Sequence, residues 1–341
     1  MFHRIRRAAA AGAALAALAL PGAAPAETFR LSHNVGDTTT WHRGAERFDE
    51  LLQEKTGGEH SVRIFPNAQL SGGDQMRQAE MTGRGAIDLL LTSAINVTPL
   101  APEMAAFSLP YLYESYEAVD ATTAGEAGRL MEEVMASHGI KVLAWGENGF
   151  REVTNSVRPI RSPEDLRGLK MRVAGPMYID VMNALGANPQ QMQWSETFPA
   201  LQQGVVDGQE NPIGAVIIPQ RVYEVQDHLT TWRYSYDPIF LGVSLDLWES
   251  WDAETRTVVE EAAEEAMAYQ IEISREDTAT GLDTLREQGM EIHEPTPEEI
   301  KAFRAATRPA FDKWAEAIGP EIVAVFEAEA ASASAASAPA E

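Results

Sequence analysis

Apolar residues in the first third of the chain recur with two different spacings, which take turns along the sequence. Short alternating or continuous apolar runs predict strands, and apolar residues spaced three or four apart predict helices. Trp41, Ala45, Phe48 and Leu52, for example, recur on one face of a helix. The predicted order is strand 28–33, helix 38–56, strand 61–65, helix 73–83 and strand 86–92. Such alternation is typical of a parallel sheet with helical crossovers.

The remainder of the chain predicts a second α/β unit followed by helices. The predicted strands and helices are 116–138 (helix), 141–145 (strand), 169–173 (strand), 178–185 (helix), 190–194 (strand), 196–203 (helix), 229–236 (strand) and 239–247 (strand). We interpret the break at Asp237–Pro238 as a crossing back to the first unit. A long amphipathic pattern over 253–288 predicts a helix that packs as a strut along both units. Residues 297–326 predict one or two further helices.

Composition narrows the classes of protein that the chain can represent. Its 341 residues suffice for about two domains of ordinary size. The formal net charge of −24 repels nucleic acid and anionic lipid, so we expect no nucleic-acid partner. The absence of cysteine excludes disulfides, thiolate ligands and a thiol nucleophile. An anionic ligand would therefore need a local positive site that acts against the overall charge.

The N-terminus predicts export from the cytoplasm. Arg4, Arg6 and Arg7 precede a short apolar run over 8–20, and Ala24-Pro25-Ala26 is a small-residue cleavage pattern. This arrangement is typical of a secretory signal peptide, which we place at residues 1–26. The alternative is a membrane anchor, but the apolar run is too short to span about 30 Å of hydrocarbon.

No motif in the chain indicates catalysis. The sequence lacks the nucleophile elbow, the phosphate-binding loop and the dinucleotide fingerprint. Its histidines have no metal-ligand spacing, so no metal and no cofactor are expected. Among them His33 is of interest because it ends the first predicted strand.

The stretch from Gly149 to Val173 contains the strongest candidate for ligand binding. Ser162 and Pro163 predict a helix start, and Gly168 ends that helix after about one turn. The following strand places Arg172 near its carboxyl end, where α/β proteins bind ligands. A guanidinium can hold a carboxylate through two parallel hydrogen bonds. The alternative is an ordinary surface or ion-paired arginine.

The same stretch resembles a known family. Its pattern GFR..TN..RPI..PEDL.GLKMRV is similar to the signature of the DctP-type solute receptors of TRAP (tripartite ATP-independent periplasmic) transporters. Residues 200–212, ALQQGVVDGQENP, resemble the second signature of that family. FPNAQL at 65–70 and SLPY at 108–111 resemble its N-terminal half. The likeness extends from about residue 28 to residue 325.

This resemblance implies an α/β, two-domain fold of the periplasmic-binding-protein kind, with crossing strands and a long connecting helix. It also implies a monomeric periplasmic receptor that closes on a small carboxylate and delivers it to the small and large membrane permease subunits. The implied boundaries are 27–149 plus 238–277 for the first domain, 150–237 plus 278–327 for the second, carboxylate-binding domain, and 328–341 for a disordered tail.

Candidate site residues come from the resemblance and from position. The resemblance implies that Arg172 grips the carboxylate, that Arg151 contacts the ligand or holds Arg172, and that Asn211 in a turn contacts the same carboxylate. Position alone suggests further candidates: the aromatic side chains Trp194, Tyr236, Tyr234 and Trp145 as pocket walls, and Asn34, Thr92 and Ser93 as contacts from the first domain. Because Leu91-Thr92-Ser93 is uncharged, a cationic group on the ligand would find no counter-ion there.

Other functions stay open at this level. The chain could be an exported enzyme that acts on a small acid, the receptor of an ABC importer, or a sensor domain that works with a kinase. The ligand is equally open among C4-dicarboxylates, sugar acids, aromatic acids, oxo acids and zwitterions such as ectoine.

Overall fold

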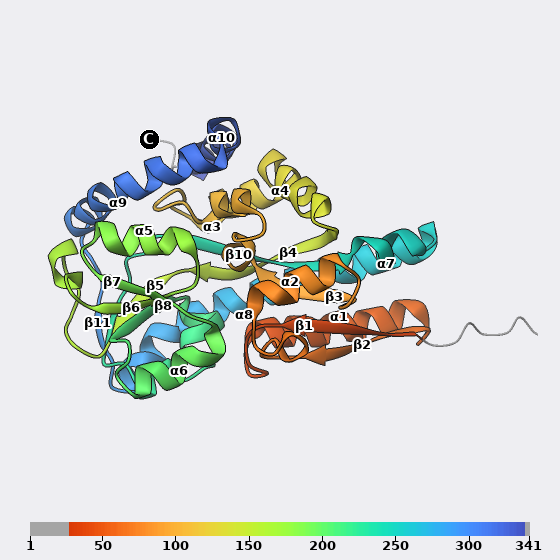
Figure 1. The fold of residues 1–341 in the computed structure, drawn as a ribbon, viewed down its shortest axis with the longest axis horizontal. Helices are drawn as coiled ribbons and strands as arrows, with labels where there is room; N and C mark the ends of the chain where they lie inside the picture. Colours follow the sequence, from red (N-terminus) through yellow and green to blue (C-terminus); the bar gives the residue numbers. More distant parts are fainter. Residues whose placement is uncertain (1–26, 338–341) are drawn as a thin grey trace, which may run out of the picture.

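The computed structural model describes residues 27–337, which contain two mixed β-sheets surrounded by helices (Figure 1). The first sheet has the strand order β2-β1-β3-β10-β4. Its strands are β1 (Glu27–His33), β2 (His60–Phe65), β3 (Leu89–Ser93), β4 (Ile140–Phe150) and β10 (Tyr236–Ser244). We call the part of the molecule built on this sheet the first lobe.

The second sheet has the strand order β11-β9-β5-β8-β6-β7 and forms the second lobe. Its strands are β5 (Glu152–Asn155), β6 (Lys170–Val173), β7 (Asn188–Gln191), β8 (Gly208–Asn211), β9 (His228–Thr230) and β11 (Glu291–His293). The two sheets together confirm the predicted two-domain α/β class.

Helices cover both sheets (Figure 1). They are α1 (Thr40–Thr56), α2 (Gln75–Gly83), α3 (Tyr116–Ala124), α4 (Glu126–Ser137), α5 (Pro176–Ala184), α6 (Trp194–Gln202), α7 (Leu245–Ser250), α8 (Ala253–Glu287), α9 (Pro297–Ile318) and α10 (Pro320–Ser337). Short turns of 3-10 or π type are η1 (Gln69–Ser71), η2 (Ala94–Val97), η3 (Pro102–Ser108), η4 (Pro163–Leu166), η5 (Ile213–Ile217) and η6 (Val222–Glu224). No helix in this part of the chain is long and apolar enough to cross a membrane.

Local chemistry explains several of these boundaries. The Thr39 side chain accepts a hydrogen bond from the first turn of α1, and Gly57 ends that helix in the left-handed conformation. Ser162 and Asp165 form the capping box that starts η4. The helix start predicted at Ser162 and Pro163 is therefore confirmed.

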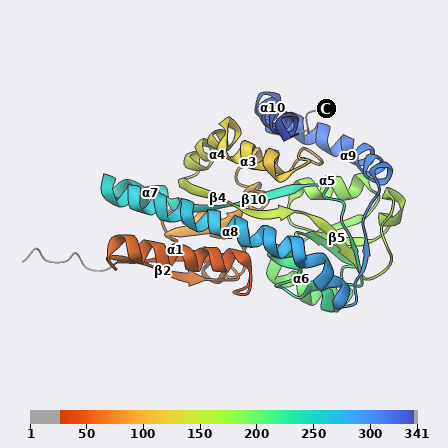
Figure 2. The same cartoon turned by 180° about the vertical axis from the view of Figure 1, so that it is seen from behind.

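Two strands and one helix join the lobes. β4 and β10 pair along almost their whole length in the first sheet, and β4 leads through Arg151 directly into β5 of the second sheet. The helix α8 packs against α1 and β4 of the first lobe and against η5 and β11 of the second (Figure 2). The predicted strut along both units is confirmed.

The structure corrects several predicted elements of the chain. The helix expected over 116–138 is two helices, because Gly125 interrupts it with an extended backbone. The strand expected over 229–236 is only His228–Thr230. Asp237 and Pro238, expected to be a break, lie inside β10, where a register shift absorbs the proline. Proline has no N–H to donate to the ladder, so it is tolerated at an irregular position where that hydrogen bond is not needed.

The C-terminal segment also differs from the expectation. Residues 328–337 were expected to be disordered because their composition is low in complexity, but α10 continues to Ser337. Its buried residues Val323, Phe326 and Ala330 belong to the apolar cluster beneath α3 and α4. The Glu329 carboxylate accepts hydrogen bonds from the backbone at Glu126 (2.6 Å) and Ala127 (3.3 Å), the start of α4. The predicted signal peptide over 1–26 lies outside the described residues.

Candidate functional site

The topology directs polar strand ends from both sheets into one cavity between the lobes. In the first sheet β1 and β3 are parallel, and β10 runs against them, so the ends near His33 and Ser93 face the start of β10. In the second sheet β6 and β8 are parallel and β5 is antiparallel to β8, so Arg172, Asn211 and the start of β5 share one edge. The edges of the two sheets therefore supply the polar lining of one site.

This cavity is small, with a volume of about 20 Å³. Both lobes contribute to its wall. The lining residues are Asn34, Val35, Trp41, Gln75, Ser93, Asn96 and Asn148 from the first lobe, and Arg151, Arg172, Ala174, Trp194, Asn211 and Val216 from the residues that follow β4. Arg151 and Arg172 are the only charged side chains among them.

Arg172 is a buried cation with no acidic partner among the described residues. Its side chain is 2% exposed, and its Nε and Nη2 donate to the carbonyl of Met192 at 3.2 and 2.9 Å. Its guanidinium lies 5.4 Å from the ring centroid of Trp194. No ion pair involves it within residues 27–337. Burial lowers the pKa of Arg172 to about 10; the charge of Glu210 partly opposes this shift, and the charge of Arg151 adds to it. A buried cation of this kind is suited to receive an anion.

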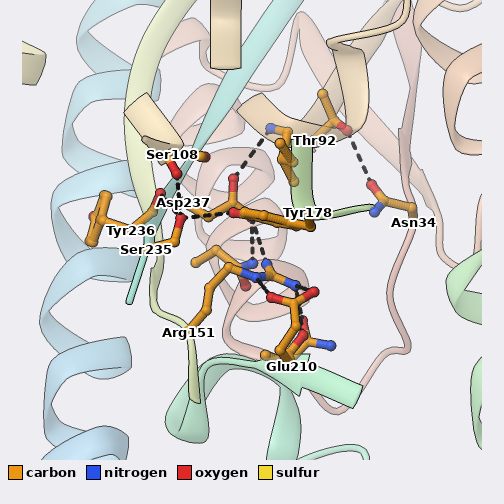
Figure 3. Close-up of polar contacts among 12 residues, drawn as sticks. Asn34, Thr92, Ser108, Arg151, Tyr178, Glu210, Ser235, Tyr236 and Asp237 are labelled. Carbon is orange, nitrogen blue, oxygen red and sulfur yellow. Dashed lines mark hydrogen bonds and ion pairs between the residues drawn. The ribbon is translucent and has the colours of Figure 1, made fainter. Parts of the chain in front are cut away.

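Arg151 is equally buried, but two carboxylates compensate its charge. It forms an ion pair with Glu210, another with Asp237 at 2.9 Å, and a hydrogen bond to the side-chain oxygen of Asn211 at 3.1 Å. Burial opposes its positive charge, but the neighbouring Glu210, Tyr178 and Asp237 raise its pKa well above the ordinary value. Figure 3 shows Arg151 between Asp237 and Glu210.

A buried hydrogen-bond network holds these two acids in place. The hydroxyl of Tyr234 donates to Glu210 at 2.9 Å. Asp237 accepts from the amide of Asn148 at 2.9 Å and from the backbone nitrogen of Ile95 at 3.3 Å. Because burial outweighs these contacts, the pKa of Asp237 is raised. The network ties β4, β8 and β10 together around the Arg151 guanidinium.

The first lobe presents uncharged amides to the cavity. Asn34 accepts a hydrogen bond from Thr92 at 3.3 Å, and Gln75 accepts one from the backbone nitrogen of Trp194 at 3.3 Å. Asn148 accepts one from the indole of Trp41 at 3.2 Å. The contact between Gln75 and Trp194 also crosses from one lobe to the other.

A second crossing lies farther out. The hydroxyl of Thr38 donates to the carbonyl of Pro219 at 2.9 Å, and the amide of Gln220 donates to Thr38 at 3.1 Å. The backbone nitrogen of Gln75 also donates to Gln193 at 3.2 Å. These contacts also join the two lobes, so the structure represents a closed arrangement.

Most of the predicted site residues come together at this cavity. Six of the predicted residues line it: Arg172, Arg151, Asn211, Trp194, Ser93 and Asn34. Asn211 lies in strand β8 and not in a turn, and Trp194 opens helix α6 where a strand was expected. These positions establish proximity; contact with a ligand stays a prediction.

Four predicted residues do not line the cavity. Thr92 lies behind Asn34, to which it donates a hydrogen bond. The ring of Tyr236 points away from Arg151 (Figure 3), and its hydroxyl donates to Glu147 at 3.2 Å. Tyr234 supports Glu210, and the Trp145 indole donates to Glu132 at 3.0 Å. These side chains point into the protein interior and not into the cavity, because successive residues of a strand face opposite sides of the sheet.

Several lining residues were missed by the sequence reasoning. Trp41 was assigned only to the apolar face of a helix, although that face reaches the cavity. Gln75 opens α2, and Asn96 lies in η2 just after β3. Polar residues directly after predicted strands are the signal that could have found Asn96. Nothing local distinguishes Gln75 from other helix starts.

His33 has a structural environment. Its ring is buried, and its Nε2 lies 2.9 Å from Nδ1 of His42. Burial and the neighbouring His42 lower the pKa of His33 to about 3, so the ring is neutral at physiological pH. His33 does not line the cavity.

A polar cavity between two lobes is typical of two-lobed solute-binding proteins. The chain belongs to the bacterial extracellular solute-binding proteins of family 7, the DctP family, whose model matches residues 31–317. It is 36% identical over 318 residues to the C4-dicarboxylate-binding periplasmic protein DctP of Rhodobacter capsulatus, covering 92% of this chain and 94% of that protein.

Solved structures agree with this assignment. The chain is similar to a TRAP periplasmic solute-binding protein from Ralstonia eutropha H16 with bound (S)-2-acetolactate, with 40% identity, a TM-score of 0.87, and coverage of 89% of this chain and 99% of that one. It is also similar to the sugar acid binding protein DctPAm of Advenella mimigardefordensis in complex with galactonate, with 28% identity, a TM-score of 0.87, and coverage of 91% and 99%.

Proposed function

We propose that this protein is the periplasmic receptor of a TRAP transporter, which captures a small organic acid between its lobes and delivers it to the small and large membrane subunits. The receptor acts by binding and not by catalysis. The proposed domains are residues 27–149 with 238–277, and 150–237 with 278–327. Membership in the DctP family supports the transport role.

One observation carries the carboxylate assignment. Arg172 keeps a guanidinium inside a closed cavity with no acid beside it, although burying an unpaired charge is costly. A ligand carboxylate that accepts from this guanidinium supplies the missing charge. Arg151 has a different role, because Glu210 and Asp237 already occupy it. The role that we assign to Arg151 is to hold Asn211 and the edge of the strand in place beside the ligand.

A wider surface groove is a weaker candidate for the site. It lies between the loop after η3 and helices α9 and α10, and Tyr111, Arg304 and Phe311 line it. Arg304 is half exposed and already pairs with Glu114 at 3.0 Å. Arg304 is therefore neither buried nor without an acidic partner, in contrast to Arg172.

A thermal-shift screen of the purified protein against organic acids tests the proposal. Acetolactate, galactonate and succinate belong in the panel, together with neutral sugars and alcohols as controls. A ligand at a hundred times its Kd stabilises by about 2.7 kcal/mol, which gives a measurable rise in Tm. The expected hits are carboxylates, and they disappear in Arg172→Ala. Hits on neutral compounds that survive this substitution would refute the proposal.

A further inference from the structure

We infer that the ligand is a monocarboxylate whose remaining polar groups are uncharged hydroxyl or carbonyl groups, and that dicarboxylates and zwitterions are poor ligands. The inference rests on the proposed function, because it takes the cavity between the lobes as the binding site. Its basis is the balance of charge around that cavity and the chemistry of the wall opposite Arg172.

The charges around the cavity provide for one carboxylate only. Arg151, Arg172, Glu210 and Asp237 are all buried, and both acids form ion pairs with Arg151. Within this group Arg172 alone has no acid beside it. A first carboxylate can pair with Arg172, but a second would face no available cation. It would add another buried negative charge, which a low-dielectric site disfavours.

The same count disfavours a ligand ammonium group. No acidic side chain lines the cavity among the described residues. Glu210 and Asp237 lie beside Arg151, and both form ion pairs with it. An amino acid would therefore leave its ammonium group without a counter-ion.

The wall supplied by the first lobe fits neutral polar groups. The Asn96 side chain makes no hydrogen bond with another described residue, and the side-chain nitrogens of Asn34 and Gln75 also lack an acceptor. Amide groups can donate to a carbonyl and exchange hydrogen bonds with a hydroxyl. Val35 and Val216 contribute apolar surface beside them. This combination suits a short carbon chain that carries hydroxyl or oxo groups.

Two series of matched acids test the inference by isothermal titration calorimetry. The four-carbon series is 2,4-dihydroxybutanoate, malate and homoserine. The six-carbon series is gluconate, glucarate and glucosaminate. Within a series only one group changes, from hydroxymethyl to carboxylate or from hydroxyl to ammonium. We expect the hydroxy acid to bind at least about thirtyfold more tightly than its two counterparts in the series that fits the cavity.

The possible results separate this inference from the proposed function. Malate or glucarate binding as tightly as the matched hydroxy acid, with binding lost in Arg172→Ala, would overturn the inference and leave the receptor proposal standing. Homoserine or glucosaminate binding equally well would overturn it in the same way. No binding of any of the six acids, together with no carboxylate hit in the thermal screen, would overturn both.

A charge-adding variant gives a second, independent readout. Asn96→Arg places a cation on the neutral wall, so we expect it to shift the Kd ratio of malate to 2,4-dihydroxybutanoate, or of glucarate to gluconate, toward the dicarboxylate by about tenfold or more. Asn183→Arg on the exposed face of α5 is the matched control and should leave both ratios unchanged. An unchanged ratio in a folded Asn96→Arg protein would contradict the inference. The wild-type series decides the question if that variant does not fold.

Discussion

Replacing Arg172 with methionine should affect stability and binding in opposite directions. The substitution removes a buried cation and retains a flexible apolar side chain that can occupy the same space. Among residues 27–337 of the ligand-free protein, the direct partners of Arg172 are the carbonyl of Met192 and the ring of Trp194. In the complex we expect it to hold the ligand carboxylate. The same guanidinium therefore destabilises one state and stabilises the other.

The structure sets the order of magnitude of both effects. Burial lowers the pKa of Arg172 from 12.5 to about 10, which corresponds to a cost on the order of 3 kcal/mol for keeping the charge inside. Its hydrogen bonds and its contact with the indole ring offset about 2 kcal/mol of this cost. Arg172→Met should therefore leave the free energy of unfolding of the ligand-free protein unchanged or raise it by about 1 kcal/mol. Loss of the buried ion pair should weaken binding by about 3–5 kcal/mol, or at least a hundredfold.

Urea unfolding without ligand and calorimetric titration with the best acid measure the two quantities. Arg172→Lys should also bind weakly, because an ammonium group cannot reproduce the two parallel hydrogen bonds. Arg129→Met on the exposed surface of α4 is the control and should change neither quantity. If Arg172→Met lowers the stability of the ligand-free protein by more than about 2 kcal/mol and retains its affinity, the arginine is structural and the reasoning is wrong.

Three further predictions concern the support of the site and the C-terminal helix. Asp237→Ala leaves Arg151 with a single acid and should lower the free energy of unfolding, measured in urea, by about 3 kcal/mol. The control Asp246→Ala, on the exposed surface of α7, should have no effect, and equal stability of the two variants would contradict the role of Asp237 as a partner of Arg151. Burial raises the pKa of Glu152 from 4.5 to about 7, so between these pH values the folded protein keeps a proton that the unfolded chain releases. The free energy of unfolding should therefore fall by up to about 3 kcal/mol as pH rises from 4.5 to 7. The slope of unfolding free energy against pH should flatten in Glu152→Gln; an unaltered slope would mean that another group titrates. Glu329→Ala removes the cap of α4 and should cost about 1 kcal/mol in thermal unfolding, and an unchanged Tm would argue against that contact.

Local patterns predicted the regular elements well where one physical signal dominated. The period of apolar residues predicted a helix over 38–56, and α1 spans Thr40–Thr56. The same signals failed where tertiary contacts compete with local preference. Asp237–Pro238 was taken for a break because proline lacks a donor, but the long pairing of β10 with β4 carries the strand through it. The alanine-rich end of α10 was taken for disorder, but Ala330 within it is buried in the same apolar cluster as Val323 and Phe326.

The sequence by itself determined the alternation of strands and helices and the place of Arg172 at a strand end, because these depend on spacing along the chain. Only the tertiary structure decided which arginine is free. Arg151 and Arg172 were both candidate site residues, but Glu210 and Asp237 contact Arg151 from 59 and 86 residues away in the sequence. Coulomb energy and desolvation depend on distance and burial in space. The folding of β8 and β10 around Arg151 therefore compensates one arginine and leaves the other without an ion pair among the described residues.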